Sequence, residues 1–184
     1  MSGNNDKQVF RGVAAGLISG FVGSWVMMRF MEGPGTRLQS TMLGTSDDST
    51  IPQQARPAES VETAANDSVT MQAADRFVNA ATGGRHLSYE SKRQGGDVVH
   101  YVFGIAMGGF YGGVAEYASV VSLGTGSVFG TVLWAGTDLL AIPAVGFAPP
   151  PQAEPPSAHA AHWMAHVVYS MSMELVRRAV RRII

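Results

Sequence analysis

Five ionisable residues stand inside or at the edge of otherwise apolar stretches of this chain and are the first candidates for chemistry. They are His100, Glu116, Asp138, His166 and Glu174. An ionisable side chain in an apolar segment is costly to desolvate, so it normally pairs with another polar group or lies on a path for protons or ions. Two roles follow. The groups could join helices by hydrogen bonds, or the histidines and carboxylates could exchange protons.

The histidines near the C-terminus raise a third chemistry, metal binding. His159, His162 and His166 recur at helical spacing, so one helix would present all three rings on one stripe. His162 and His166 are four residues apart and could chelate one ion with an acidic ligand from another helix. However, residues 162–166 read His-Trp-Met-Ala-His, without the glutamate of a zinc protease. We therefore predict no metal, no other cofactor and no catalytic residue, with a metal-dependent membrane enzyme as the third hypothesis.

The distribution of charge indicates what surrounds these residues. The chain of 184 residues has 13 Lys and Arg, and all of them lie in 7–93 or 177–182, so 94–176 contains none. A soluble helical domain seldom leaves such a run without a cation, because its helices need solvated faces. The partner of this region is therefore predicted to be the lipid bilayer. A net charge of −1 without a basic, aromatic patch gives no reason to expect nucleic acid.

Four apolar segments are long enough to cross a bilayer, at 12–28, 98–115, about 128–147 and 159–176. The sequence therefore predicts an all-α integral membrane protein, a bundle of about four transmembrane helices. A signal peptide is the rival interpretation of the first segment, but Val26-Met27-Met28 offers no small-residue cleavage site. Arg177, Arg178, Arg181 and Arg182 predict a cytoplasmic C-terminus. Arg85, Lys92 and Arg93 would then lie outside, on a loop too long for the charge rule to be strong.

Three regions follow from this organisation: 1–31 with the first span, a polar loop at 32–96, and a three-helix membrane region at 97–184 with an arginine-rich end. Helical spacing within the loop predicts one amphipathic helix at about 60–82, capped by Gly83-Gly84. It would lie on the membrane surface or over the mouth of the bundle, or else pack on its own loop. A short hairpin is expected at 122–127 and a polyproline connector at 148–156.

Glycines recur every four residues in two of the predicted spans. One ladder contains Gly12, Gly16 and Gly20, and the other contains Gly104, Gly108 and Gly112. Because apolar burial cannot drive helix association in lipid, rows of small residues that let backbones approach are a common packing device. We expect the first and second spans to touch along these ladders, although the same ladders could also serve a homo-oligomer.

Four blocks of the sequence resemble the YagU-like family of bacterial inner-membrane proteins, a domain of unknown function numbered 1440. The blocks run from Ala14-Ala15-Gly16-Leu17 to Ser24-Trp25-Val26-Met27, from His100-Tyr101-Val102-Phe103-Gly104 to Tyr111-Gly112-Gly113-Val114-Ala115-Glu116, from Gly126 and Phe129-Gly130 through Trp134 and Asp138 to Pro143, and from His162 through His166-Val167-Val168-Tyr169 to Glu174-Leu175-Val176-Arg177-Arg178. The resemblance implies a multi-pass protein of the bacterial inner membrane without an established activity.

The leading hypothesis is a structural or accessory membrane protein that binds a second copy or another membrane protein. The alternative is a proton-linked or small-solute transport element that uses the five ionisable residues of the apolar stretches. Geometry separates the two, because a transport path needs Asp138 and Glu174 to line one continuous cavity. A structural role instead needs each of them to have a local partner.

Overall fold

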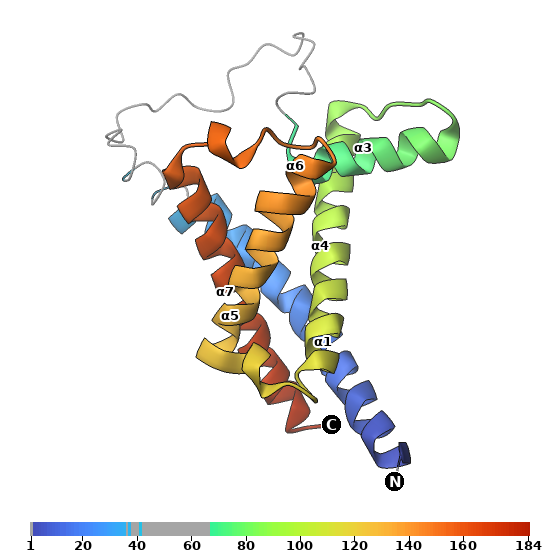
Figure 1. The fold of residues 1–184 in the computed structure, drawn as a ribbon. Helices are drawn as coiled ribbons and strands as arrows, with labels where there is room; N and C mark the ends of the chain where they lie inside the picture. Colours follow the sequence, from blue (N-terminus) through green and yellow to red (C-terminus); the bar gives the residue numbers. More distant parts are fainter. Residues whose placement is uncertain (1, 36, 38–40, 42–66) are drawn as a thin grey trace.

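The computed structural model describes residues 2–35, 37, 41 and 67–184, and this part of the chain is helical and contains no strand. The long helices are α1 (Ser2–Glu32), α4 (Tyr89–Val114) and α7 (Pro156–Arg181). A composite helix consists of η2 (Ser119–Gly126), α5 (Ser127–Trp134), η3 (Ala135–Ala141) and α6 (Ile142–Ala144). These four units run in alternating directions, so both termini lie at the same end of the bundle (Figure 1). The predicted all-α class is confirmed.

Two helical stretches in the described part of the chain are long and apolar enough to cross a membrane. They are Asp6–Glu32 in α1 and Ser119–Ala144 in the composite helix. Helices α4 and α7 have 26 residues each but are not among these candidates. Each of the four predicted spans thus corresponds to a helix, and two of these helices are long and apolar enough to cross a membrane.

Helices α1 and α4 meet backbone to backbone along the two glycine ladders. A Cβ atom added to Gly20 would lie 2.5 Å from the carbonyl oxygen of Gly104, and one added to Gly108 would lie 2.6 Å from the Cα of Gly20. An added Cβ at Gly16 or Gly112 would likewise meet backbone of the opposite ladder. Such contacts leave no room for any side chain, so the ladders are occupied within a single chain.

The composite helix departs from the sequence prediction at both ends. Instead of a hairpin at 122–127, residues 119–126 form a 3₁₀ helix with a kink, where Gly124 and Thr125 have positive φ angles of 58° and 57°. Further along, η3 is a π-helix in which the N–H of Ile142 donates to the carbonyl of Thr137. Pro143 has no N–H to donate to the preceding turn, so the wider spacing is a natural consequence of that proline. The sequence analysis did not foresee this π-helix.

Helix α3 (Val69–Thr82) lies across the end of α4, close to α6 (Figure 1). Its N-cap is Ser68, whose Oγ accepts a hydrogen bond from the N–H of Met71. Its C-cap is Gly83, which has a left-handed backbone with φ 70° and confirms the predicted cap. The predicted start at residue 60 lies outside the described residues. The structure begins the helix at Val69, so the predicted boundary was too early.

Polar contacts attach α3 to the elements around it. Arg76 donates to the carbonyl oxygens of Val145 and Gly146 and lies over the ring of Phe147. On the other side, a Cβ added to Gly96 would meet the Met71 side chain at 3.0 Å, so α3 packs tightly on α4. The structure places α3 against the end of α4, and it also has contacts with its own flanking loop, where Asp75 bonds to His86 and Leu87.

The predicted polyproline connector is interrupted. Pro150, Glu154 and Pro155 have extended backbones, but Pro151–Ala153 form a 3₁₀ turn, η4, between them. The nitrogen Nε2 of His159 donates to the carbonyl of Pro151 at 2.8 Å and ties this turn to the start of α7.

We predict that Gly108→Ala destabilises the fold by about 1–3 kcal/mol, because its Cβ would overpack the backbone of α1. The matched control is Gly136→Ala, whose added Cβ meets nothing within 4 Å. The control variant should be neutral or gain about 0.5–1 kcal/mol from the lower backbone entropy of alanine in a helix. Thermal unfolding of the two variants measures the difference. Equal melting temperatures would contradict the close contact.

Acid should loosen the attachment of α3 through Asp75. Burial alone would raise the pKa of this carboxyl, but hydrogen bonds from His86 and from the N–H of Leu87, at 2.8 and 2.6 Å, outweigh it and hold the pKa below its usual value. The stabilisation is therefore present above the usual Asp pKa of about 4 and is lost as the pH falls through the lower folded value. Hydrogen–deuterium exchange of 69–82 should accelerate below that pH, and Asp75→Asn should show the faster exchange already at neutral pH. Exchange that is independent of pH in the native protein, after correction for intrinsic rates, would refute this.

Candidate functional site

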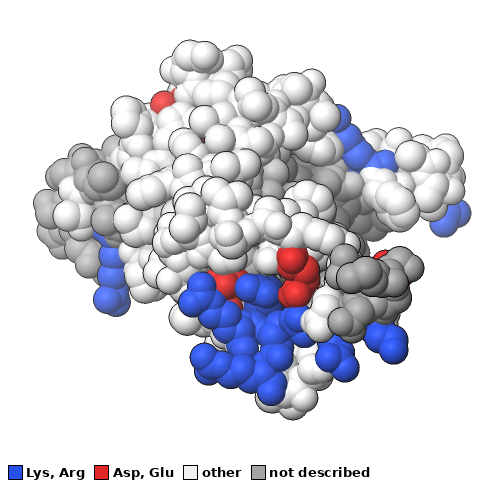
Figure 2. Space-filling view, turned by 60° about the horizontal axis from the view of Figure 1, so that its bottom comes forward, with Lys and Arg blue, Asp and Glu red and all other residues white. Residues whose placement is uncertain are grey.

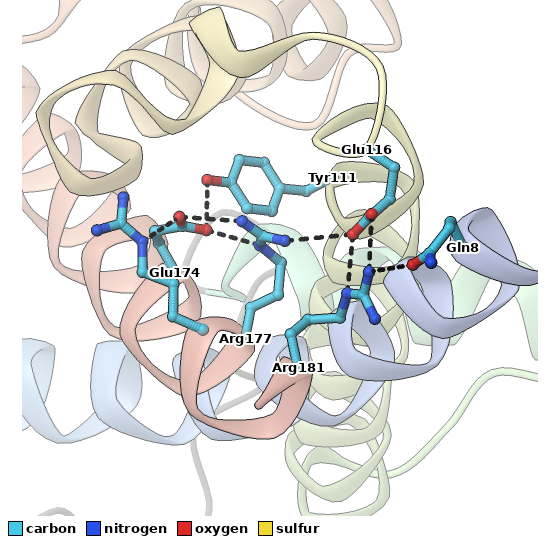
Figure 3. Close-up of polar contacts among 7 residues, drawn as sticks. Gln8, Tyr111, Glu116, Glu174, Arg177 and Arg181 are labelled. Carbon is cyan, nitrogen blue, oxygen red and sulfur yellow. Dashed lines mark hydrogen bonds and ion pairs between the residues drawn. The ribbon is translucent and has the colours of Figure 1, made fainter. Parts of the chain in front are cut away.

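Glu174 is the most deeply buried charged residue described in the bundle, with a side chain that is 0% exposed. It lies on α7 one turn before Arg177 and Arg178, so all three can meet on one helix face. The Nε atoms of these arginines lie 2.7 and 2.6 Å from its two carboxylate oxygens. The hydroxyl of Tyr111, on α4, donates to the same carboxylate at 2.8 Å (Figure 3). Its hydrogen-bonding capacity is therefore met inside the protein.

A second carboxylate, Glu116, joins the end of α4 to both neighbouring helices. Arg181 makes a bidentate contact with Glu116, in which Nε and Nη2 each lie 2.9 Å from a different carboxylate oxygen. Nη2 of Arg181 also donates to the side-chain oxygen of Gln8 on α1 at 2.9 Å. Arg177 completes the set, with Nη1 3.6 Å from Glu116 (Figure 3). We call Glu116, Glu174, Arg177, Arg178 and Arg181 the arginine–carboxylate lock.

The lock neutralises most of its own charge. Two carboxylates face three guanidinium groups, which leaves one positive charge. Burial would lower the pKa of Arg177, but its hydrogen bond to Glu174 raises that pKa above its usual value. Charge-assisted hydrogen bonds of this kind fix geometry strongly, and removing one partner leaves the other charge buried without compensation. The lock therefore holds α1, α4 and α7 together at the end of the bundle where both termini lie.

A separate pair of ionisable groups joins the composite helix to α7. Nε2 of His166 lies 3.4 Å from a carboxylate oxygen of Asp138, and both side chains are mostly buried. The other ring nitrogen of His166, Nδ1, lies 2.9 Å from the carbonyl oxygen of His162, one turn earlier. Asp138 lies in the π-helix η3, next to Thr137, whose hydroxyl donates to the carbonyl of Leu133 at 2.8 Å. No arginine or lysine takes part in these contacts.

Two further histidines, His100 and His159, have partners of their own. Nε2 of His100 donates to the carbonyl of Ser24, and so connects α4 to α1. His159 donates to Pro151 and lies 3.9 Å from Glu154. Among the described residues, no three His, Asp or Glu side chains converge in an arrangement that could hold a metal ion. The structure therefore does not bring His159, His162 and His166 together as ligands, although they share one helix.

The five ionisable residues predicted from the sequence thus lie in three separate places. Glu116 and Glu174 belong to the lock, Asp138 and His166 form a pair, and His100 bonds to the backbone of α1. The sequence analysis missed the partners Arg177, Arg181 and Tyr111, because it interpreted the two arginines as topology signals and did not include Tyr111 among the candidate residues. The spacing Glu174-x-x-Arg177-Arg178 was the available signal, since acids and arginines three and four residues apart share a helix face.

The fold and the site define a class, an all-helical bundle protein whose ionisable side chains are paired with one another inside it. The chain belongs to the family described as "Protein of unknown function (DUF1440)", which matches residues 77–175, more than half of its length. The matched region contains Glu116, Asp138, His166 and Glu174, and it agrees with the family resemblance of the sequence blocks. Searches of curated proteins and of solved structures gave no match.

We expect Glu174→Gln to destabilise the fold by about 3–5 kcal/mol, because Arg177 and Arg178 would lose a buried counter-charge and face an amide donor. Glu90→Gln is the matched control, since Glu90 forms the same kind of pair with Arg93 three residues later but on an exposed surface. Water screens that pair, so the control should change the melting temperature little. Thermal unfolding of both variants provides the comparison. A similar, small effect in each would show that the lock contributes nothing beyond a surface ion pair.

Proposed function

We propose that this chain is a multi-pass protein of the bacterial inner membrane, with four spans and both termini in the cytoplasm, and that its role is structural or accessory rather than enzymatic. The observation that carries the proposal is an inverted distribution of side chains. The largest fully buried side chains are Tyr111, Met173, Glu174, Ser19, Ser24 and Ser170, so a carboxylate and three serines are among them, whereas many large apolar side chains face outward.

The outward-facing apolar side chains come from every helix of the bundle. Phe21 of α1, Phe110 of α4 and Leu140 of the composite helix are 52, 59 and 68% exposed. The candidate span Ser119–Ala144 is only 11% buried inside the protein. Water would penalise such a surface, and soluble monomers rarely expose large contiguous apolar patches. A lipid environment removes the penalty, and it also accommodates an interior in which serines and a carboxylate accompany a small apolar cluster around Tyr111, Tyr169 and Met173.

The distribution of Lys and Arg supports the proposed orientation of the protein in the membrane. Figure 2 shows Lys and Arg gathered on the end of the molecule where the termini lie. The exposed members of this patch include Lys7, Arg11, Arg178 and Arg182, while 94–176 contains no cation. Positive residues next to membrane spans favour the cytoplasmic side, so we place this end in the cytoplasm. Helix α3 and the exposed Arg85 and Arg93 then lie on the opposite side of the membrane.

The structural or accessory role follows from how the polar groups are used. Glu116 and Glu174 each have local partners in the lock, as a structural role requires. The glycine ladders are occupied by contact between α1 and α4, so self-association through them would require separating these helices. We therefore assign any contact with a second copy or a partner protein to another surface of the bundle.

Proton-linked transport is the second candidate function, and one observation favours it. The pair of His166 and Asp138 is ionisable, mostly buried and free of arginine or lysine, unlike the lock. Histidine and carboxylate chains of this kind carry protons through membrane proteins.

The topology can be tested by cysteine labelling, because the chain has no cysteine and each introduced one is unique. We expect Arg85→Cys to react with a membrane-impermeant maleimide in intact bacterial cells. Ile183→Cys, at a residue 84% exposed near the C-terminus, should react only after the cells are opened. The protein without cysteine measures background labelling. Reaction of both cysteines in intact cells, or recovery of the chain in the soluble fraction, would refute the proposal.

A further inference from the structure

We infer that His166 and Asp138 together form a proton-binding site, which holds one exchangeable proton between α7 and η3. The inference deepens the second candidate function by locating the groups that would carry the proton. It rests on geometry at both ring nitrogens of His166 and does not require that the chain span a membrane.

The first step concerns the nitrogen Nδ1 of His166. It lies 2.9 Å from the carbonyl oxygen of His162, within the same helix. A carbonyl oxygen can only accept a hydrogen bond, so Nδ1 must carry a hydrogen and donate it. This contact fixes the tautomer of the ring. In neutral His166 the other nitrogen, Nε2, then has a lone pair and no hydrogen.

The second step concerns Nε2, which lies 3.4 Å from Oδ2 of Asp138. A lone pair on Nε2 and an ionised carboxylate are both acceptors, so they gain no attraction from facing each other. One proton changes this. With the proton on Nε2 the pair is imidazolium and carboxylate, and with the proton on Oδ2 it is imidazole and carboxylic acid. Either form is favourable and the pair is then neutral, whereas release of the proton to water leaves one negative charge on the pair.

The surroundings allow this proton to exchange. The side chains of His166 and Asp138 keep 12 and 20% of their surface exposed. The other titratable groups that act on His166 are His162 on α7 and His100 on α4, and no cation from lysine or arginine is among them. The hydroxyl of Thr137 lies 3.4 Å from Oδ2 of Asp138 and is the other polar group at the carboxylate. The negative charge of the pair is thus balanced by the one proton that the two side chains share.

The backbone around Asp138 is consistent with a specialised site. Asp138 lies within η3, the π-helical segment that ends at Ile142. Single π-helical turns inside α-helices are rare and occur frequently at functional sites. The wider turn sets the direction in which the Asp138 side chain leaves the helix. The carboxylate of Glu174 differs from that of Asp138, because donors on Arg177, Arg178 and Tyr111 satisfy it without an added proton.

The test is ¹⁵N NMR of histidine-labelled full-length protein in lipid nanodiscs, with His166 assigned through His166→Gln. In the native protein we expect Nδ1 of His166 to stay protonated and Nε2 to change from imine to protonated as the pH is lowered from about 8 to 5. In Asp138→Asn, the amide can donate to Nε2 without an added proton. The Nε2 signal of that variant should therefore remain at the imine position over the same range.

Two further variants complete the experiment. Asp138→Glu retains a carboxyl group and should retain the titration, and Asp97→Asn removes an exposed carboxylate elsewhere on α4 and should leave it unchanged. An Nε2 signal that titrates identically in the native protein and in Asp138→Asn would overturn the inference. If Asp138→Asn does not fold, the inference is overturned equally by an Nε2 that stays imine in the native protein and in Asp138→Glu, together with a ¹³C signal of the carboxyl group at position 138 that shows no uptake of a proton over the same range.

Proton flux into liposomes, measured with a trapped pH dye, separates this inference from the transport function. Flux in the native protein that is lost in Asp138→Asn supports both. Absence of flux, with the Nε2 titration intact, ends the transport candidate and still supports the proton-binding site. A failed cysteine topology test would not change the NMR signals expected for Nδ1 and Nε2 of His166, because the inference does not require a membrane span.

Discussion

The backbone contact between α1 and α4 is the interaction on which the other contacts of the bundle depend. Because neither glycine ladder has side chains, the two helices approach until added Cβ atoms would collide with backbone. At this separation His100 reaches the carbonyl of Ser24, and Gln8 reaches Arg181 beside Glu116. The bare backbone also leaves the carbonyl of Gly104 open, and the hydroxyl of Tyr169 donates to it at 2.6 Å. This hydrogen bond connects α7 to the ladder of α4.

The ionisable groups of this bundle are compensated in two different ways. In the lock, carboxylates face guanidinium groups that remain charged at every physiological pH, so their state is permanent. Between His166 and Asp138, the compensating charge is a proton, which can be gained or lost. Both arrangements satisfy the requirement that charge inside an apolar structure be paired. The arginine–carboxylate lock fixes the geometry of the helices, whereas the His166–Asp138 pair can change its charge when the pH changes.

Sequence periodicity predicted the helices well where glycine or apolar spacing was regular. The two ladders and the cap at Gly83 could be read directly, because they depend on local backbone geometry. The π-helix could not be read in advance, since Pro143 is compatible with several ways of ending or bending a helix. Ser170 and Glu174 of α7 are buried, so the hydropathy of this helix alone does not describe the surface that it presents. Only the three-dimensional packing shows that Glu174 meets Tyr111 from α4.

The partners of the candidate site were hidden for a related reason. Arg177 and Arg178 are adjacent to Glu174 on α7, and their spacing could have suggested the contact. The contact of Arg181 with Glu116 joins residues 65 positions apart and depends on how α4 and α7 cross. The pairing of Asp138 with His166 likewise requires the turn through η4 that reverses the chain. Sequence analysis located the ionisable residues that are costly to bury but could not identify their partners.

The backbone contact between the two glycine ladders also has a mechanical consequence. Side chains can switch rotamers, but a contact made of backbone has no such freedom and can only separate as a whole. Helices α1 and α4, with Tyr169 inserted against them, therefore behave as one rigid body. The composite helix packs chiefly on α7, and Gly124, Thr125 and Gly126, which have a left-handed backbone, separate the first part of η2 from α5. Gly126 and Gly130 meet the backbone of α7 at the same close range, which keeps Asp138 of the composite helix beside His166 of α7.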